Sequence, residues 1–382
     1  MKKILCLLFA AMAILSSCQK DNIQPIVPNQ DSVADSTDTP NYPAELGQIV
    51  GCALSAETPG DLVLVGTQGA AETWYSQTNN EGFGSTCSDI VYFDNYYYIS
   101  APDLNCIMKV NATTGKKSGQ IALGNLKPKF MLTHGGKLYV SSSKHSVSRI
   151  NLATGRLEST CRLSATSAGR MCIIGSQMFV CNGWEDDSDG FWPLNHAFSV
   201  VDLHTFTQTG TIGFDESITS PDDEESRALQ PIDIKALDNL HLVVTLCEHA
   251  HASPLGKMSL AVIDIDNLSW TLMAAGADHI AMDVDSNTIY SHEVFTDANA
   301  NRNIYFYKRT VNGAHINVET TINPSVYPLM DVTHLCVHPA THNLYCYNCP
   351  ARQSTLYVFS HAGNLIYHSN AGQSTSGMAF CL

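Results

Sequence analysis

A segment of about 40 residues recurs along this 382-residue chain, and the repeat limits the folds that are open to it. The clearest copies are Tyr98-Ile-Ser with Ile107-Met-Lys-Val-Asn-Ala-Thr-Thr-Gly115, and Tyr139-Val-Ser with Val147-Ser-Arg-Ile-Asn-Leu-Ala-Thr-Gly155. Weaker copies contain Phe179-Val-Cys, Leu242-Val-Val, Ile289-Tyr-Ser and Leu344-Tyr-Cys. Six copies at a shared period favour one repeat architecture over several unrelated domains.

Within each copy, runs of roughly four to eight apolar or alternating residues are separated by Gly, Asn, Asp and Pro, which is the pattern of strands and hairpins. Three further predicted strands, 61–66, 72–76 and 376–382, belong to no full copy. If the last strand completes a sheet begun by the first, the array closes and leaves no sheet edge exposed. The sequence therefore predicts an all-β fold, a seven-bladed β-propeller of four-stranded blades, closed by pairing the N-terminal strands with the C-terminal strand.

The N-terminus has the features of an export signal. Lys2 and Lys3 precede an apolar run, residues 4–15, which is shorter than the roughly 20 residues that span a bilayer. The run ends at Leu15-Ser-Ser-Cys18, which resembles a bacterial lipobox. We therefore expect residues 1–17 to be a lipoprotein signal peptide and Cys18 to be the lipidated N-terminus.

The segment after the predicted lipid is polar. Residues 18–45 hold few large apolar side chains, so they predict a flexible tether, and residues 46–382 form the predicted propeller. Gln19-Lys-Asp-Asn22 resembles the export signal of surface lipoproteins in the Bacteroidetes. The expected location is the outer membrane, facing the cell exterior, with contact to the membrane through the lipid anchor only.

The turns of the repeat, in which Thr-Gly follows Ile or Val and then Asn, resemble those of YncE-like propellers of the surface-layer type. The resemblance covers nearly all of residues 60–382 and implies the propeller fold. Some lipoproteins of this kind in gut Bacteroidetes capture corrinoids such as cobalamin (vitamin B12) and pass them to a TonB-dependent outer-membrane transporter. The resemblance thus implies a corrinoid as one candidate ligand and such a transporter as a partner.

Long connections are expected on one face of the ring. In four successive copies the predicted loop between the second and third strands is extended: residues 182–196, 247–256, 292–302 and 348–353. Loops at this position open on the same face of a propeller, and insertions on one face are typical of binding surfaces in repeat proteins.

These loops carry aromatic, imidazole and guanidinium groups, which suit a large planar ligand or a protein surface. The alternative is that Trp184 and Trp192 only pack their own loop. The predicted ligand-binding residues are Trp184, Trp192, His196, His249, His251, His292, Phe295, Arg302 and Arg352.

Two metal sites are open alternatives in the same loops. Glu185, Asp187 and Asp189 have the alternating spacing of a calcium loop, but His196 replaces the bidentate Glu expected at position 12, which favours a solvated acidic loop over a calcium site. Cys247, His249 and His251 offer zinc or cobalt ligands, without a clear fourth ligand. His334, His338 and His342 have helical spacing but fall at an expected hairpin turn, so we expect surface histidines.

Eleven cysteines remain after Cys6 leaves with the signal peptide and Cys18 is lipidated. Cys172 with Cys181, and Cys336 with Cys346, lie on adjacent predicted strands, where either disulfides or free buried thiols are possible. Cys346 and Cys349 have redox spacing without the strand-to-helix context that activates a thiol.

The charge and the missing motifs exclude several functions. Without Lys2 and Lys3, the 21 basic residues fall to 19 against 36 acidic ones, a formal charge of −17, which argues against nucleic acid and anionic lipid. Because no nucleophile motif or complete metal constellation is evident, we expect no enzyme; a propeller lyase or lactonase is the enzymatic alternative. A surface scaffold for a protein or glycan is the remaining hypothesis.

Overall fold

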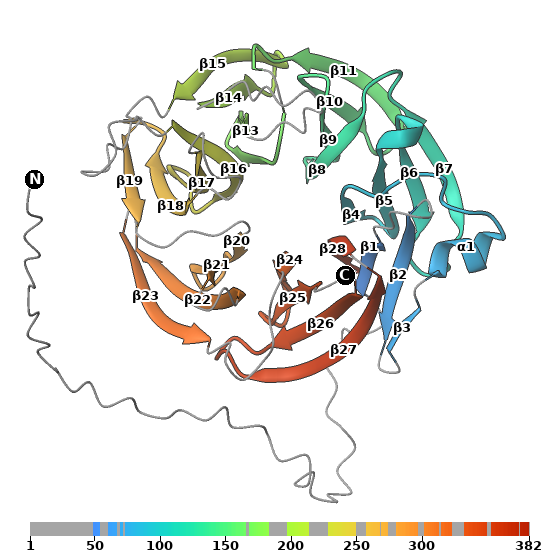
Figure 1. Cartoon of the computed structure of the whole chain (residues 1–382). Helices are drawn as coiled ribbons and strands as arrows, with labels where there is room; N and C mark the ends of the chain where they lie inside the picture. The colour runs from blue at the N-terminus through green and yellow to red at the C-terminus, as the bar shows by residue number, and fades with distance from the viewer. Residues whose placement is uncertain are drawn as a thin grey trace, which may run out of the picture. The chain divides into compact units, whose positions relative to one another are not determined.

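The computed structural model describes residues 49–53, 60–66, 69–71, 73–165, 168–182, 197–213, 228–249, 257–267, 269–273, 280–296, 302–312, 315–322, 332–349, 353–373 and 375–381. In this part of the chain, seven antiparallel four-stranded sheets are arranged in a ring (Figure 1). The prediction of a seven-bladed β-propeller is therefore confirmed. The predicted signal peptide, Cys18 and the tether to residue 45 lie outside the described residues.

The strands are named from the centre of the ring outwards. Blade 1 contains β28 (Thr375–Phe380), β1 (Ile49–Ala53), β2 (Asp61–Gly66) and β3 (Gly69–Ala71). Blade 2 contains β4 (Ile90–Phe93), β5 (Tyr96–Ala101), β6 (Cys106–Asn111) and β7 (Lys117–Ala122). Blade 3 contains β8 (Pro128–His134), β9 (Lys137–Ser142), β10 (Ser146–Asn151) and β11 (Arg156–Arg162).

The other four blades follow the same order. Blade 4 contains β12 (Met171–Ile174), β13 (Gln177–Cys181), β14 (Ala197–Asp202) and β15 (Thr207–Gly213); blade 5 contains β16 (Ala228–Ala236), β17 (His241–His249), β18 (Lys257–Asp264) and β19 (Ser269–Met273). Blade 6 contains β20 (Ile280–Asp283), β21 (Thr288–Thr296), β22 (Arg302–Asn312) and β23 (His315–Ile322). Blade 7 contains β24 (Val332–Val337), β25 (Leu344–Asn348), β26 (Gln353–Phe359) and β27 (Leu365–Gln373).

Blade 1 closes the ring as the sequence predicted. The C-terminal strand β28 is its inner strand and pairs antiparallel with β1. Each inner strand contacts the inner strand of the next blade, and β28 contacts both β24 and β4. The closure therefore leaves no inner strand at a free end of the array, which avoids the exposed edges of an open repeat.

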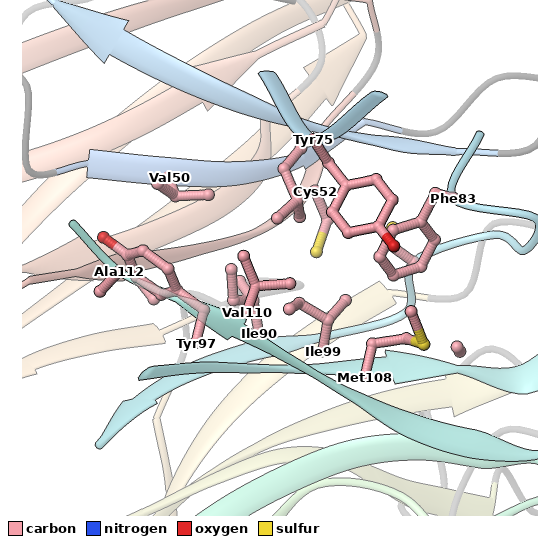
Figure 2. Close-up of a cluster of buried hydrophobic side chains, with 14 of the residues drawn as sticks. Val50, Cys52, Tyr75, Phe83, Ile90, Tyr97, Ile99, Met108, Val110 and Ala112 are labelled. Carbon is pink, nitrogen blue, oxygen red and sulfur yellow. The ribbon is translucent and has the colours of Figure 1, made fainter. Parts of the chain in front are cut away.

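The hydrophobic core is divided among the interfaces between blades. In the described residues, buried apolar side chains form seven clusters, and each cluster joins one pair of neighbouring blades. Figure 2 shows the cluster between blades 1 and 2, where Val50 and Cys52 face Ile90, Tyr97 and Ile99. Tyr98 enters the cluster on the other side of blade 2, because successive side chains of a strand point to opposite faces. Strands buried on both faces explain the continuous apolar runs of the sequence.

The repeated Asn-x-x-Thr-Gly segment forms the predicted hairpin turn. In blade 2 the Oδ1 atom of Asn111 accepts hydrogen bonds from the backbone N–H groups of Thr113 and Thr114, at 3.1 and 2.9 Å. Gly115 follows with φ of +69° and donates to the carbonyl of Asn111. A Cβ at Gly115 would lie 2.7 Å from the ring of Trp74, so glycine is needed here for two independent reasons.

One predicted strand is wrong. Residues 72–76 were expected to be extended, but residues Trp74–Asn79 form the short helix α1. The Oδ1 atom of Asp61 accepts hydrogen bonds from the backbone N–H groups of Tyr75 and Ser76, at 3.1 and 3.3 Å. A carboxylate from a distant strand thus satisfies the first turn of the helix, and this tertiary contact overrides the strand preference of Trp and Tyr. Strand β1 was not predicted from the sequence either.

Candidate functional site

In blades 4, 5 and 6 the longest connection within the blade joins the second strand to the third, at equivalent strand ends; in blade 7 the same connection is short. In blades 4 to 7 the second strand is joined to the third by residues that lie wholly or partly outside the described part: 183–196, 250–256, 297–301 and 350–352. Blades 2 and 3 make the same connection with the short 3₁₀ helix Pro102–Leu104 and with residues 143–145. Because all blades share one strand order, these four connections attach at the same end of the ring.

In blades 5 and 6 part of the predicted loop is strand. Cys247 and His249 belong to β17, and residues 292–296 and 302 belong to β21 and β22. The pairing of β21 with β22 continues through Phe295 with Asn303 to Thr296 with Arg302. The expectation of long loops starting at Cys247 and His292 is therefore wrong, since the strand pairs continue as extended hairpins. The expectation of a long loop over 348–353 is wrong as well, because Asn348 ends β25 and Gln353 begins β26.

Only one predicted ligand-binding side chain lies among those that the structure describes. For His249, Phe295 and Arg302 the structure gives the backbone strand alone. The others lie outside the described residues, as do the predicted calcium ligands and the lipidation site: Trp184, Trp192, His196, His251, Arg352, Glu185, Asp187, Asp189 and Cys18.

The exception is His292, which is inside its blade. Its exposed fraction is 1%, and its ring lies 6.0 Å from that of Phe306 on the paired strand β22. The expectation of an exposed loop histidine is wrong at this position, because alternation along β21 turns this residue inwards.

A cavity of about 400 Å³ lies in the centre of the ring, at the opposite end from the connections between second and third strands. Its wall comes from the inner strands of blades 3 to 7, at the ends where each first strand turns into the second. Most of the wall is apolar, with some polar or sulfur-bearing side chains: Thr133, His134, Met171, Cys172, Lys235, Met282 and Cys336. This volume falls at the lower end of the range of small-molecule sites, roughly 300–1,000 Å³.

A layer of charged and aromatic side chains lies next to this cavity along the inner strands. Asp89, Phe130, Arg170 and Asp233 each precede the residue that makes the equivalent strand pair in blades 2, 3, 4 and 5. The guanidinium of Arg170 lies 4.5 Å from the ring centre of Phe130. One position of the repeat thus carries an acidic, an aromatic or a basic side chain in different blades.

Asp233 is the buried charge in this layer, with an exposed fraction of 2%. Its Oδ1 atom lies 3.8 Å from both Nε of Arg170 and Nζ of Lys235, and accepts the backbone N–H of Ile234 at 2.8 Å. Its Oδ2 atom accepts the backbone N–H of Ile280 in the next blade at 3.3 Å. The carboxylate therefore joins two inner strands, and its charge is matched by two cations.

Asp89 plays the same part between blades 2 and 3. Its carboxylate accepts the backbone N–H of Ile90 at 3.0 Å and that of Met131, in the next blade, at 2.7 Å. Burial raises the pKa of Asp89, against the lowering effects of Arg170 and of these two N–H groups. The geometry therefore identifies both aspartates as links between the inner strands of neighbouring blades.

The eleven cysteines after Cys18 are free thiols. Cys172 lies opposite Phe179, and Cys336 opposite Tyr345, so neither is directly paired with its predicted partner. Burial raises the pKa of the thiols of Cys172, Cys181, Cys336 and Cys346. Of the two alternatives left open by the sequence, the structure has the free thiols.

The three histidines of the predicted surface turn differ from one another. His334 and His338 are buried, and the ring of His338 packs edge-on against Phe380 with 4.8 Å between ring centres. Nδ1 of His338 accepts the backbone N–H groups of Ala340 and Thr341. His342 is partly exposed and reaches Asp283 in blade 6. The expectation of surface histidines is wrong for the first two, because the ring places the strand before this turn in its interior.

Sequence reasoning missed the cavity and its charged layer. The signal existed: once the copies are aligned, Asp89, Phe130, Arg170 and Asp233 fall in one column. Those residues look like ordinary strand starts until the ring brings the inner strands together.

In the part of the chain that the structure describes, no helix has the length and hydropathy needed to cross a membrane.

Comparisons with known proteins bear on the fold. Hydrazine synthase from Kuenenia stuttgartiensis is similar with a TM-score of 0.53 and 16% identity, over 71% of this chain and 76% of that chain. BamB from Moraxella catarrhalis is similar with a TM-score of 0.46 and 9% identity, over 78% of each chain. No protein-family model matches the sequence, and no curated protein matches it. At 16% identity, the first similarity supports the propeller fold and says nothing of a ligand.

Proposed function

We propose that this protein is a lipid-anchored, non-catalytic binding protein of the outer cell surface. In this proposal it holds a corrinoid on the ring face where the second strand of each blade is joined to the third, and passes it to a TonB-dependent outer-membrane transporter. A β-propeller is compatible with either a ligand-binding or a scaffold role, so the ligand has to be argued from the site.

One observation carries the proposal: in three successive blades, 4 to 6, the longest connection within the blade joins the second strand to the third, and all three attach at the same end of a closed ring. The ring provides a rigid base, because each interface between blades has its own apolar cluster in the described part. Because the connections are attached to such a base, they can surround one large ligand with a small loss of conformational entropy. The central cavity supports the same choice of face, since about 400 Å³ is too small for a corrin ring with its side groups.

The residue types of these connections add chemical support. Trp184 and Trp192 offer flat apolar area for a planar ring, and Arg352 and His251 offer donors for amide or phosphate groups. The formal charge of −17 expected after export argues against nucleic acid as the ligand.

The proposal is tested by exchanging the connections. We would replace residues 183–196 and 250–256 by short Gly-Ser turns and measure the affinity for cyanocobalamin. Loss of affinity with an unchanged unfolding midpoint supports the proposal. Unchanged affinity would place the corrinoid elsewhere, and no affinity in the parent protein would favour a scaffold for a protein or glycan.

A further inference from the structure

A cluster of carboxylate and imidazole groups lies between blades 6 and 7, outside the site proposed above. Asp283 ends the inner strand β20, and Asp285 lies in the turn that follows it. His342 lies in the equivalent turn of blade 7, between β24 and β25. These turns are at the end of the ring opposite to the connections between second and third strands, so the cluster is independent of the corrinoid proposal.

The donor atoms of these three residues are close together. One ligand atom from each of Asp283, Asp285 and His342 lies within 4.8 Å of the others. The closest contact joins Oδ1 of Asp283 to Nδ1 of His342, at 3.0 Å. Ligand atoms around a tetrahedral zinc ion, with bonds of roughly 2.0–2.1 Å, are separated by roughly 3.3 Å. The two contacting atoms already have about this spacing, and Asp285 on an exposed turn has room to approach.

The second oxygen of Asp283 is held by other groups. Its Oδ2 atom accepts the hydroxyl of Ser286 at 2.7 Å, and Nδ1 of His361 lies 3.6 Å away. Nε2 of His361 lies 3.2 Å from Nζ of Lys308, and its Nδ1 lies 3.2 Å from the hydroxyl of Tyr290, so both ring nitrogens of His361 have partners that fix the ring beside the carboxylate. Outer hydrogen bonds of this kind orient a metal-binding carboxylate and leave its other oxygen for the ion.

Asp283 also has the burial and charge of a ligand. Its side chain is 3% exposed. Its carboxylate is held by the hydroxyl of Ser286 and contacts the partly exposed imidazole of His342. Without an ion, the same contacts form a hydrogen-bonded link between two blades, which is the alternative that the experiment must exclude.

We propose that Asp283, Asp285 and His342 bind one divalent first-row transition ion between blades 6 and 7. Two carboxylates and one imidazole suit Zn²⁺, Co²⁺ or Mn²⁺ better than they suit an ion that prefers thiolates. Three protein ligands leave a position for water. The ion would tie the turn after β20 to the turn after β24, at the end of the ring where the inner strands finish.

The test is a titration of the metal-free purified protein with Co²⁺, followed by its absorption spectrum. We expect one ion per chain, with visible bands of nitrogen and oxygen coordination and no thiolate-to-cobalt charge-transfer band. Asp285→Asn and His342→Gln should each weaken binding by at least about tenfold, as loss of a ligand does more than loss of an outer partner. His361→Asn should weaken it less, since that residue acts through Asp283.

His241→Gln is the matched control. Nδ1 of His241 lies 2.8 Å from Oδ2 of Asp238 in the corresponding turn of blade 5, but no third donor of this kind lies within the same spacing there among the described residues. This variant should bind Co²⁺ like the parent protein. The proposal is overturned if the parent binds no Co²⁺, if a thiolate band shows that the cysteines take the ion, or if Asp285→Asn and His342→Gln bind it unchanged. Unfolding midpoints without metal establish that each variant is folded.

Discussion

The backbone of Val50 in β1 pairs with that of Ala379 in β28, so the two ends of the described chain share blade 1. Next to this pair, Gly51 lies against Tyr347 of blade 7, and a Cβ at Gly51 would be 2.8 Å from the tyrosine hydroxyl. The closing blade is therefore held both by strand pairing and by a close side-chain fit to its neighbour.

Gly51→Ala should destabilise this closure. The added methyl group has no room beside Tyr347, and overpacking of this kind lowers the free energy of unfolding by about 1–3 kcal/mol. Chemical denaturation of the parent and the variant measures the change. Tyr347→Phe should restore part of the loss, because it removes the atom closest to the new methyl group.

Two controls make this prediction specific. Tyr347→Phe alone should be neutral or stabilising, since the buried hydroxyl of Tyr347 has no hydrogen-bond partner among the described residues. Gly210→Ala, in β15, adds a methyl group with nothing within 4 Å and should change little. Equal effects of Gly51→Ala and Gly210→Ala would contradict the close fit.

Asp103→Asn should change the dependence of stability on pH. The carboxylate accepts the backbone N–H of Thr86 at 2.8 Å and its hydroxyl at 2.9 Å, and these bonds, led by the backbone one, lower the pKa of Asp103. A lowered pKa in the folded state adds stability above the unfolded value of about 3.9, and this stability is lost as the pH falls through the folded value. Because Asp103 is exposed, we expect the variant to lose about 1 kcal/mol or less at pH 7.

The measurement is denaturation of parent and Asp103→Asn protein at several pH values between neutrality and pH 3. The difference between them should shrink as the pH falls. A constant difference in the free energy of unfolding over this range would show that the charge of the Asp103 carboxylate does not stabilise the folded protein.

The thiols should be unreactive in the folded protein. Nine of the eleven free cysteines are buried, and the two partly exposed ones are Cys336 and Cys381. Burial raises the pKa of Cys336, and a thiol reacts through its thiolate, so Cys336 should also react slowly. Titration with a disulfide reagent should modify at most Cys381 quickly before denaturant is added, and all eleven thiols afterwards. Rapid modification of several thiols in the native protein would contradict the packing between the blades.

The two ends of the ring should respond differently to loss of an arginine. Arg352→Ala, in the connection between β25 and β26, should weaken corrinoid binding by about 1.5–3 kcal/mol if its guanidinium makes a charged hydrogen bond. Arg156→Ala removes an exposed arginine at the start of β11, on the hairpin face, and should leave the affinity unchanged. An equal effect of both changes would indicate long-range charge in place of a contact.

The ring could be predicted from the sequence because its signals are local and repeated. Strand alternation and the Asn-Thr-Gly turns identify the blades, and the unmatched terminal strands imply closure. Helix α1 could not be predicted, since its first turn depends on Asp61, a residue of β2. The same limit applies to His338, whose burial against Phe380 depends on the strand that closes the ring.

The candidate sites were less accessible to sequence reasoning. The cluster at Asp283 combines residues from turns of two blades, and no spacing within either turn marks a metal site. The charged layer at Asp233 depends on which residues of the inner strands face one another. The residues chosen from the long connections could be selected only by side-chain chemistry, since a loop sequence does not define its conformation.

The most direct test of the proposed function is a calorimetric titration of residues 46–382 with cyanocobalamin, repeated in the presence of a chelator. The account predicts tight binding at one corrinoid per chain, and binding that persists with the chelator, because the proposed ion lies at the other end of the ring. No heat at micromolar protein would contradict corrinoid capture and leave the ring as a scaffold whose partner must be sought at the cell surface.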